Sequence, residues 1–121
     1  MNQVLDSLTI NGVEYARRDS VKSVPEVTDD YVIVRTTSAG VFAGHLHSRV
    51  GKEVTLTNAR RLWKWVGAAS LSQLAMEGVS KPNECRFPTP VTSILLTEAI
   101  EVIGCTLKAK ESIEGVPVWK A

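Results

Sequence analysis

The amino-acid sequence predicts an α+β fold: an antiparallel β-meander with two short helices, preceded by an N-terminal β-hairpin arm. Three observations predict this class. β-Branched residues are concentrated in residues 31–37, short turns containing glycine separate the apolar runs, and the hydrophobic period becomes helical in residues 70–78. The chain has 121 residues, so we expect residues 31–121 to form a single domain.

Residues 1–30 are expected to form an arm and a linker before this domain. Asn11-Gly12 lies between alternating apolar and polar residues, which predicts a hairpin because a type I′ turn needs positive φ at both central positions. From Arg17 to Asp30 the chain is polar and contains Pro25, a composition typical of a linker.

Three strands are predicted next, over residues 31–37, 41–50 and 53–65. Ser38-Ala39-Gly40 supplies the first tight turn. Gly51-Lys52 fits a two-residue type II′ turn, which takes glycine at its first central position. Strands joined by such short turns form a meander. The second carries apolar residues on both faces, which favours a central position.

The C-terminal half alternates between helical and extended patterns. Ser70 and Gln73 form a capping-box pattern and Gly78 marks a stop, which predicts a short helix. Residues 81–90 contain three prolines and are expected to be a loop or an edge segment. Residues 91–105 are apolar and β-branched, so one or two strands are expected, the second over residues 99–103. Thr106 is expected to cap a last helix that ends near Glu114.

Composition excludes several classes of protein. No apolar run approaches the ~20 residues that cross a bilayer, and no secretory signal is recognisable, so neither a membrane partner nor export is expected. A formal net charge of +1 disfavours a general nucleic-acid binder. In a reducing cytosol the two cysteines, Cys85 and Cys105, are expected to be small core residues rather than a disulfide.

The sequence favours a protein without catalysis, metal or cofactor. His45 and His47 lie two apart on a predicted strand, which places both imidazoles on one face, but these are the only histidines and a zinc site needs three or four ligands. No nucleophile elbow, phosphate-binding loop or zinc-protease motif is present. We therefore expect no enzyme activity.

Residues 58–65 form the most informative stretch, with two arginines, a lysine and two tryptophans and no acid. On a regular strand Arg61, Trp63 and Trp65 share one face, whereas Arg60 shares the other with Asn58. Such rings could stack on a nucleotide base while an arginine binds its phosphate. Alternatively, the tryptophans fill the core or a subunit contact and the arginines extend to solvent.

Several segments resemble a family of small phage and prophage proteins. They are residues 31–41, 58–63 and 67–75, and residues 103–106 together with residues 112–115. The resemblance covers about residues 31–121 and extends to the anti-Thoeris sponge proteins of phages. It implies a homo-oligomer in the cytoplasm of the infected bacterial host that sequesters a defence signal of the cyclic ADP-ribose type without cleaving it. Some such sponges also bind cyclic oligonucleotides at separate sites.

These expectations give a set of candidate ligand-binding residues. They combine the basic and aromatic stretch, the first tight turn, an arginine of the neighbouring strand and the loop over residues 83–87: Arg35, Ser38, Ala39, Gly40, Arg60, Arg61, Trp63, Trp65, Asn83 and Phe87. Because strand faces alternate, Arg60 and Arg61 point to opposite faces, and one of them is expected to contribute far more to ligand binding than the other. The alternative function is a phage accessory protein that binds a host protein through its tryptophans.

Overall fold

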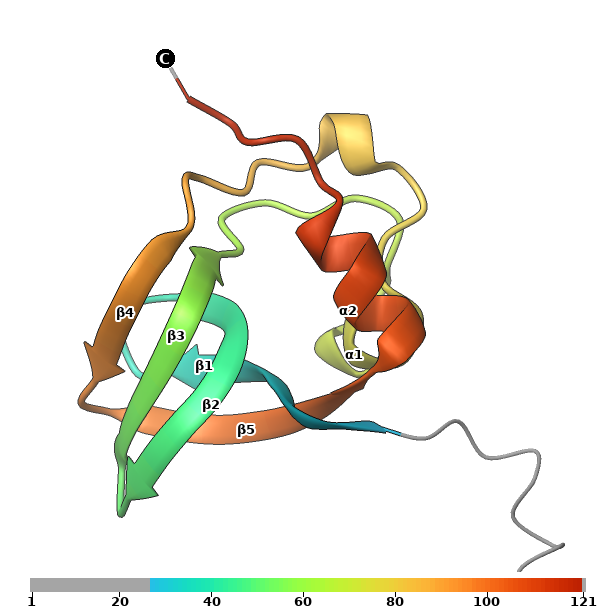
Figure 1. The fold of residues 1–121 in the computed structure, drawn as a ribbon. Helices are drawn as coiled ribbons and strands as arrows, with labels where there is room; N and C mark the ends of the chain where they lie inside the picture. The colour runs from blue at the N-terminus through green and yellow to red at the C-terminus, as the bar shows by residue number, and fades with distance from the viewer. Residues whose placement is uncertain (1–26, 121) are drawn as a thin grey trace, which may run out of the picture.

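The computed structural model describes residues 27–120, which form an α+β fold (Figure 1). The strands and helices follow one another as β1 (Val27–Thr36), β2 (Val41–Val50), β3 (Glu53–Arg61), α1 (Leu71–Glu77), the 3₁₀ helix η2 (Pro82–Glu84), β4 (Val91–Leu96), β5 (Ala99–Thr106) and α2 (Leu107–Glu114). The expected antiparallel sheet and two short helices are confirmed. The predicted N-terminal hairpin lies outside the described residues.

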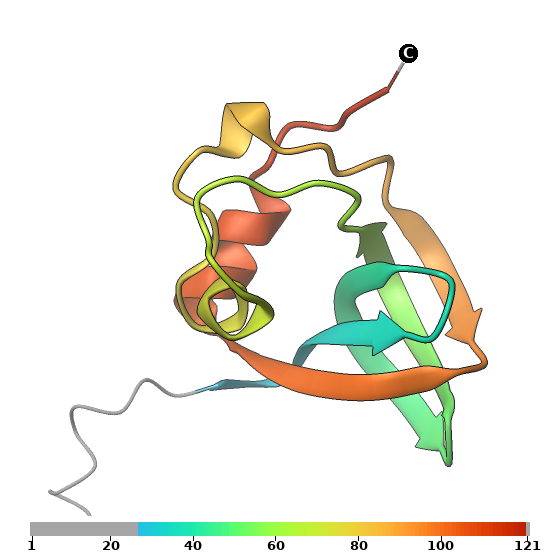
Figure 2. The same ribbon diagram turned by 180° about the vertical axis from the view of Figure 1, so that it is seen from behind.

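The five strands form one antiparallel sheet in the order β4-β3-β2-β1-β5. β4 and β5 stand at opposite ends of this order, yet only Thr97 and Glu98 separate them along the chain. The sheet must therefore curl, as Figures 1 and 2 show. At the corner where its edges approach, the Thr37 amide donates to Glu98 O at 3.1 Å and the Ala99 amide donates to Lys52 O at 3.0 Å.

Glycine sets both turns of the meander. Gly40 has φ +100° and ends the turn after β1. Val50 pairs with Glu53, so a two-residue loop joins β2 to β3, and Gly51 occupies its first position with φ +59°. Few residues other than glycine adopt such positive φ angles without strain. The predicted two-residue turn is confirmed, and β2 occupies the centre of the sheet as expected.

Both helices begin at the predicted caps. The Ser70 hydroxyl accepts from the Gln73 amide at 3.2 Å, and the Thr106 hydroxyl accepts from the Ala109 amide at 3.1 Å. Each cap satisfies an amide that has no partner within its helix. α1 ends at Gly78, whose φ is +78°. The helices pack together on one side of the curled sheet (Figures 1 and 2).

The core has two parts, and β1 contributes to both. Tyr31 and Ile33 pack with the helices and with the residues after β3, whereas Val32 and Val34 pack with β3 inside the curl of the sheet. Cys85 and Cys105 are buried in the first part and neither forms a disulfide, as expected. Burial on both faces makes β1 the structural centre of the domain.

Two predicted boundaries are wrong. β1 begins at Val27, although the chain through Asp30 was expected to be a linker, because Val27 pairs with Thr106 of β5. β3 ends at Arg61 rather than Trp65, because the next residues leave the sheet and Lys64 pairs instead with Arg86. Thr97-Glu98 does divide residues 91–105 into two strands, as expected.

Among the described residues, no helix is long and apolar enough to span a membrane.

Candidate ligand-binding surfaces

Arg60 lies inside the protein, with 4% of its surface exposed. Its Nη1 donates to Ile113 O at 3.0 Å and to Val116 O at 2.7 Å, and its Nη2 donates to Phe87 O at 3.0 Å. These carbonyls belong to the end of α2, the residues after it and the proline-rich loop, so one guanidinium joins three segments to the sheet. Burial lowers the pKa of Arg60, an effect that the neighbouring Tyr31 opposes.

Arg61 points to the other side of the sheet and is exposed. Its guanidinium lies 4.4 Å from the centre of the Phe42 ring and donates to the carbonyl of Ala39. Together with Ser38 and Ala39 of the turn, it lines a cavity of about 180 Å³. The structure thus brings three candidate residues together, with Gly40 beside them. Glu98 lines the same cavity, and its carboxylate disfavours a phosphate there.

Trp63 takes part in an aromatic surface that includes the C-terminal segment. Its ring stacks on Trp119, with 4.9 Å between the ring centres and 24° between the planes. The Arg86 guanidinium lies 5.7 Å from the centre of Trp63 and 5.5 Å from that of Trp119. Trp63 is 56% exposed and Trp119 43% exposed. We call these three residues the tryptophan platform.

Backbone pairing holds the tryptophan platform in place. Lys64 and Arg86 exchange backbone hydrogen bonds of 3.2 and 2.7 Å, and the Trp119 amide donates to Phe87 O at 3.0 Å. Three segments that are distant in sequence are thereby fixed side by side. The rings and the guanidinium extend from paired backbone, so an apolar surface lies beside a positive charge.

The other candidate residues lie elsewhere. Trp65 is partly buried against the core and does not share the exposed position of Trp63. Arg35 pairs with Glu101 across β1 and β5, with 2.9 Å between Nε and Oε1. Asn83 is exposed in η2, and Phe87 is fully buried. The expectation that Arg61, Trp63 and Trp65 share one face is wrong, since the strand ends at Arg61.

Two members of the tryptophan platform were not among the candidates. Arg86 lies next to the proposed loop residue Phe87, and alternation along the chain could have indicated that it faces outward. Trp119 follows the last helix, and no local pattern indicated that this segment returns to pair with residue 87. Its contact with Trp63 depends on tertiary structure alone.

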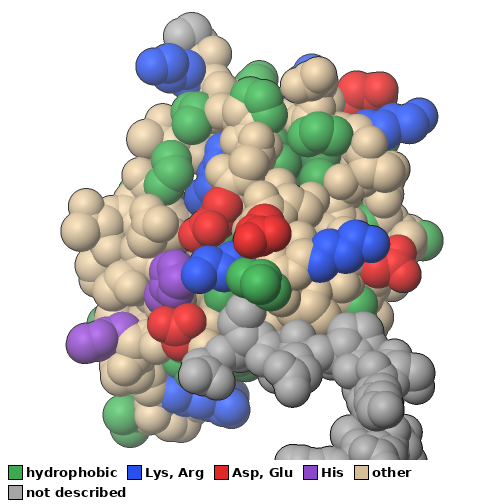
Figure 3. All heavy atoms as spheres, turned by 45° about the vertical axis from the view of Figure 1, so that its right-hand side comes forward, with side chains coloured by type: hydrophobic (Ala, Val, Ile, Leu, Met, Phe, Trp, Pro, Cys, Tyr) green, Lys and Arg blue, Asp and Glu red, His purple; other side chains and the backbone are tan. Residues whose placement is uncertain are grey.

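His45 lies among acidic groups. Its Nδ1 is 3.2 Å from Asp30 Oδ1, its Nε2 is 3.7 Å from Glu114 Oε2, and its ring meets the Tyr31 ring edge-on at 5.1 Å. Figure 3 shows histidine side chains beside acidic ones on this face. A register shift separates Leu46 from Ser48, so the alternation assumed for His47 is interrupted. Within residues 27–120, no group of three side chains could hold a metal ion.

Comparison with known proteins gives one match. Residues 29–113 match the model of a family described as a domain of unknown function (DUF6948). The match runs from within β1 to within α2, and so covers most of the described domain. Neither the curated proteins nor the solved structures contain a match to this chain.

Proposed function

We propose that this chain, which belongs to the DUF6948 family, binds a nucleotide signal and sequesters it without cleaving it. The tryptophan platform is the observation that carries the proposal. A nucleotide needs a flat apolar surface for its base and a fixed cation for its phosphates, and Trp63, Trp119 and Arg86 provide both within one exposed surface. Stacking of a base on an aromatic side chain contributes about 1–3 kcal/mol.

The surroundings of the reactive side chains support binding without turnover. Burial raises the pKa of the Cys105 thiol to about 12, so this group is neutral at physiological pH. Cys85 is buried, and its sulfur accepts a hydrogen bond from the Val66 amide at 3.3 Å. His45 faces the carboxylates of Asp30 and Glu114 and the ring of Tyr31. A covalent mechanism needs a nucleophile beside a base.

The resemblance to phage sponge proteins makes cyclic ADP-ribose the first ligand to test. In this proposal the chain acts as an anti-defence protein in the cytoplasm of an infected bacterium. A second copy of the chain completes the site, because the tryptophan platform is an open surface and a small ligand binds most tightly when both of its faces are covered. Light scattering at micromolar concentration should therefore give a mass above that of one chain.

Isothermal titration calorimetry with cyclic ADP-ribose tests the proposal. Trp63→Ala should weaken binding about fivefold or more, since stacking contributes about 1–3 kcal/mol, and Arg86→Ala about tenfold or more, since a charge-assisted hydrogen bond contributes about 1.5–3 kcal/mol. Arg35→Ala is the matched control, because it removes an exposed arginine whose partner is Glu101. Chromatography after a long incubation should return intact ligand. Absence of binding to both cyclic ADP-ribose and cyclic oligonucleotides, or recovery of ADP-ribose, would refute the proposal.

A second candidate function is recognition of a host protein by the same surface. Val118 is 45% exposed next to Trp119, which adds aliphatic area to the tryptophan platform. Tryptophan and arginine are the residues most enriched at energetic centres of protein interfaces. A folded wild-type protein that binds neither cyclic ADP-ribose nor cyclic oligonucleotides would favour this candidate over the first.

A further inference from the structure

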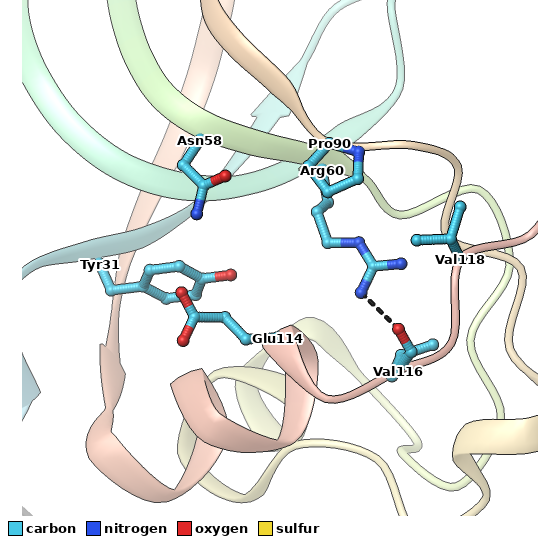
Figure 4. Close-up of a pocket in the computed structure, with 7 residues that line it drawn as sticks. All are labelled: Tyr31, Asn58, Arg60, Pro90, Glu114, Val116 and Val118. Carbon is cyan, nitrogen blue, oxygen red and sulfur yellow. Dashed lines mark hydrogen bonds between the residues drawn. The ribbon is translucent and has the colours of Figure 1, made fainter.

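A second cavity, of about 170 Å³, lies between β3 and the C-terminal end of α2 (Figure 4), and none of the three residues of the tryptophan platform lines it. It is lined by a phenol, an amide, a guanidinium, a carboxylate and three aliphatic side chains: Tyr31, Asn58, Arg60, Glu114, Pro90, Val116 and Val118. For comparison, a cavity of about 150 Å³ binds benzene. A ligand of similar or slightly larger size would fit.

Arg60 lines this cavity, and its donors are incompletely satisfied, although Nε itself is buried. Its hydrogen bonds to three carbonyls use three of the five N–H groups of a guanidinium, and Nε has no hydrogen-bond partner. Among the described residues, no acidic side chain lies within 4.0 Å of Arg60. A cation that is 4% exposed and lacks an acidic partner favours an anionic group nearby.

Glu114 brings the opposite charge. It is the last residue of α2, where the helix dipole disfavours a carboxylate. Figure 4 shows its carboxylate beside Tyr31, on the side of the cavity opposite Arg60. Its Oε2 lies 3.7 Å from His45 Nε2. Glu114 and Arg60 therefore line one cavity with opposite charges that do not pair with each other.

Asn58 is directed into the cavity by a distortion of β3. Two residues, Asn58 and Ala59, lie opposite Gly44 of β2, which is a β-bulge. Asn58 has φ +49°, and it is the only described residue other than glycine with positive φ. Its amide points into the cavity in Figure 4. Bulges often redirect a side chain beside a binding site, and a left-handed residue retained in a strand costs about 1 kcal/mol or more.

We propose that this cavity binds a free α-amino acid with a short aliphatic side chain. The α-carboxylate accepts from the Asn58 amide and lies near the positive charge of the Arg60 guanidinium, while the α-ammonium donates to the Glu114 carboxylate. The aliphatic side chain packs against Pro90, Val116 and Val118. A zwitterion of this kind supplies each charged wall of the cavity with the opposite charge. The inference does not depend on the tryptophan platform.

The test uses the full-length protein, with L-valine as the probe in isothermal titration calorimetry. Two analogues isolate the charges: isobutylamine lacks the carboxylate and isovalerate lacks the ammonium. L-Valine should bind saturably, and each analogue should bind at least tenfold more weakly. Glu114→Gln should weaken L-valine binding at least tenfold. Glu111→Gln is the matched control, because Glu111 is exposed on the same helix and does not line the cavity.

Asn58→Gly provides a second variant that should fold, since glycine adopts the same φ without strain. It should reduce L-valine binding severalfold while the melting temperature stays the same or rises. Trp63→Ala should leave L-valine binding unchanged, which separates this inference from the proposed function. Equal binding of isovalerate and L-valine, or equal affinities of the Glu114→Gln and Glu111→Gln variants, would overturn the inference.

Discussion

Replacing Arg60 by alanine should destabilise the domain strongly, although Arg60 is a charged residue in a stretch that suggests a binding surface. The change removes three hydrogen bonds from a cation to the carbonyls of Phe87, Ile113 and Val116. It also removes a cation–π contact in which the guanidinium lies 5.4 Å from the Phe87 ring. Hydrogen bonds to charged groups contribute about 1.5–3 kcal/mol each.

The loss should be smaller than the sum of these contributions, because water can enter from the adjacent cavity and bind the exposed carbonyls. We expect Arg60→Ala to lower the free energy of unfolding by about 3–5 kcal/mol, out of a total of about 5–15 kcal/mol for a typical domain. Arg60→Lys should lower the free energy of unfolding by less, since the lysine ammonium keeps the positive charge. Some loss should remain, because an ammonium cannot reproduce the planar guanidinium that spans three carbonyls.

Urea denaturation followed by tryptophan fluorescence measures this difference. Arg61→Ala is the matched control, because Arg61 is the adjacent arginine and is exposed. It should lose less than about 1 kcal/mol. Similar losses for the Arg60→Ala and Arg61→Ala variants, or a loss below about 1 kcal/mol for Arg60→Ala, would refute the view that Arg60 joins α2 and the proline-rich loop to the sheet.

Two further predictions concern buried groups. The Thr106 hydroxyl accepts from the Ala109 amide and donates to Met76 O at 2.7 Å, so Thr106→Ala should cost about 1.5–3 kcal/mol in thermal denaturation. Thr106→Ser keeps both hydrogen bonds and should lose clearly less stability than Thr106→Ala. Equal losses of stability would contradict the role of the hydroxyl. Burial raises the pKa of Cys105 to about 12, so the unfolded thiol loses its proton at lower pH than the folded one. The contribution of Cys105 to stability should therefore fall between about pH 9 and 12, by up to about 1.4 kcal/mol per pH unit. A Cys105→Ala variant with the same slope in urea denaturation would contradict the assignment.

Local sequence signals determined most of the secondary structure. Gly51 indicates a two-residue turn because few other residues tolerate its positive φ, and the hydroxyls of Ser70 and Thr106 mark the starts of both helices. These signals act within a few residues, so they can be read without knowledge of the fold. The predicted end of the third strand failed because apolar and basic residues continue past Arg61, while the hydrogen bonding that defines a strand does not.

The positions of the candidate site residues depend on tertiary structure. Alternation correctly predicted that Arg60 and Arg61 face different surroundings, but it could not indicate which one is buried. That outcome depends on carbonyls 27, 53 and 56 residues away, which only the packing of α2 and the proline-rich loop brings near. In the same way, the bulge at Asn58 depends on pairing with β2, and the stacking of Trp63 on Trp119 depends on the returning C-terminal segment. The sequence determined the turns, the helix caps and the residue types available for binding. Tertiary structure decided which of them share a surface, because the partners of each side chain come from segments that are far apart in the chain.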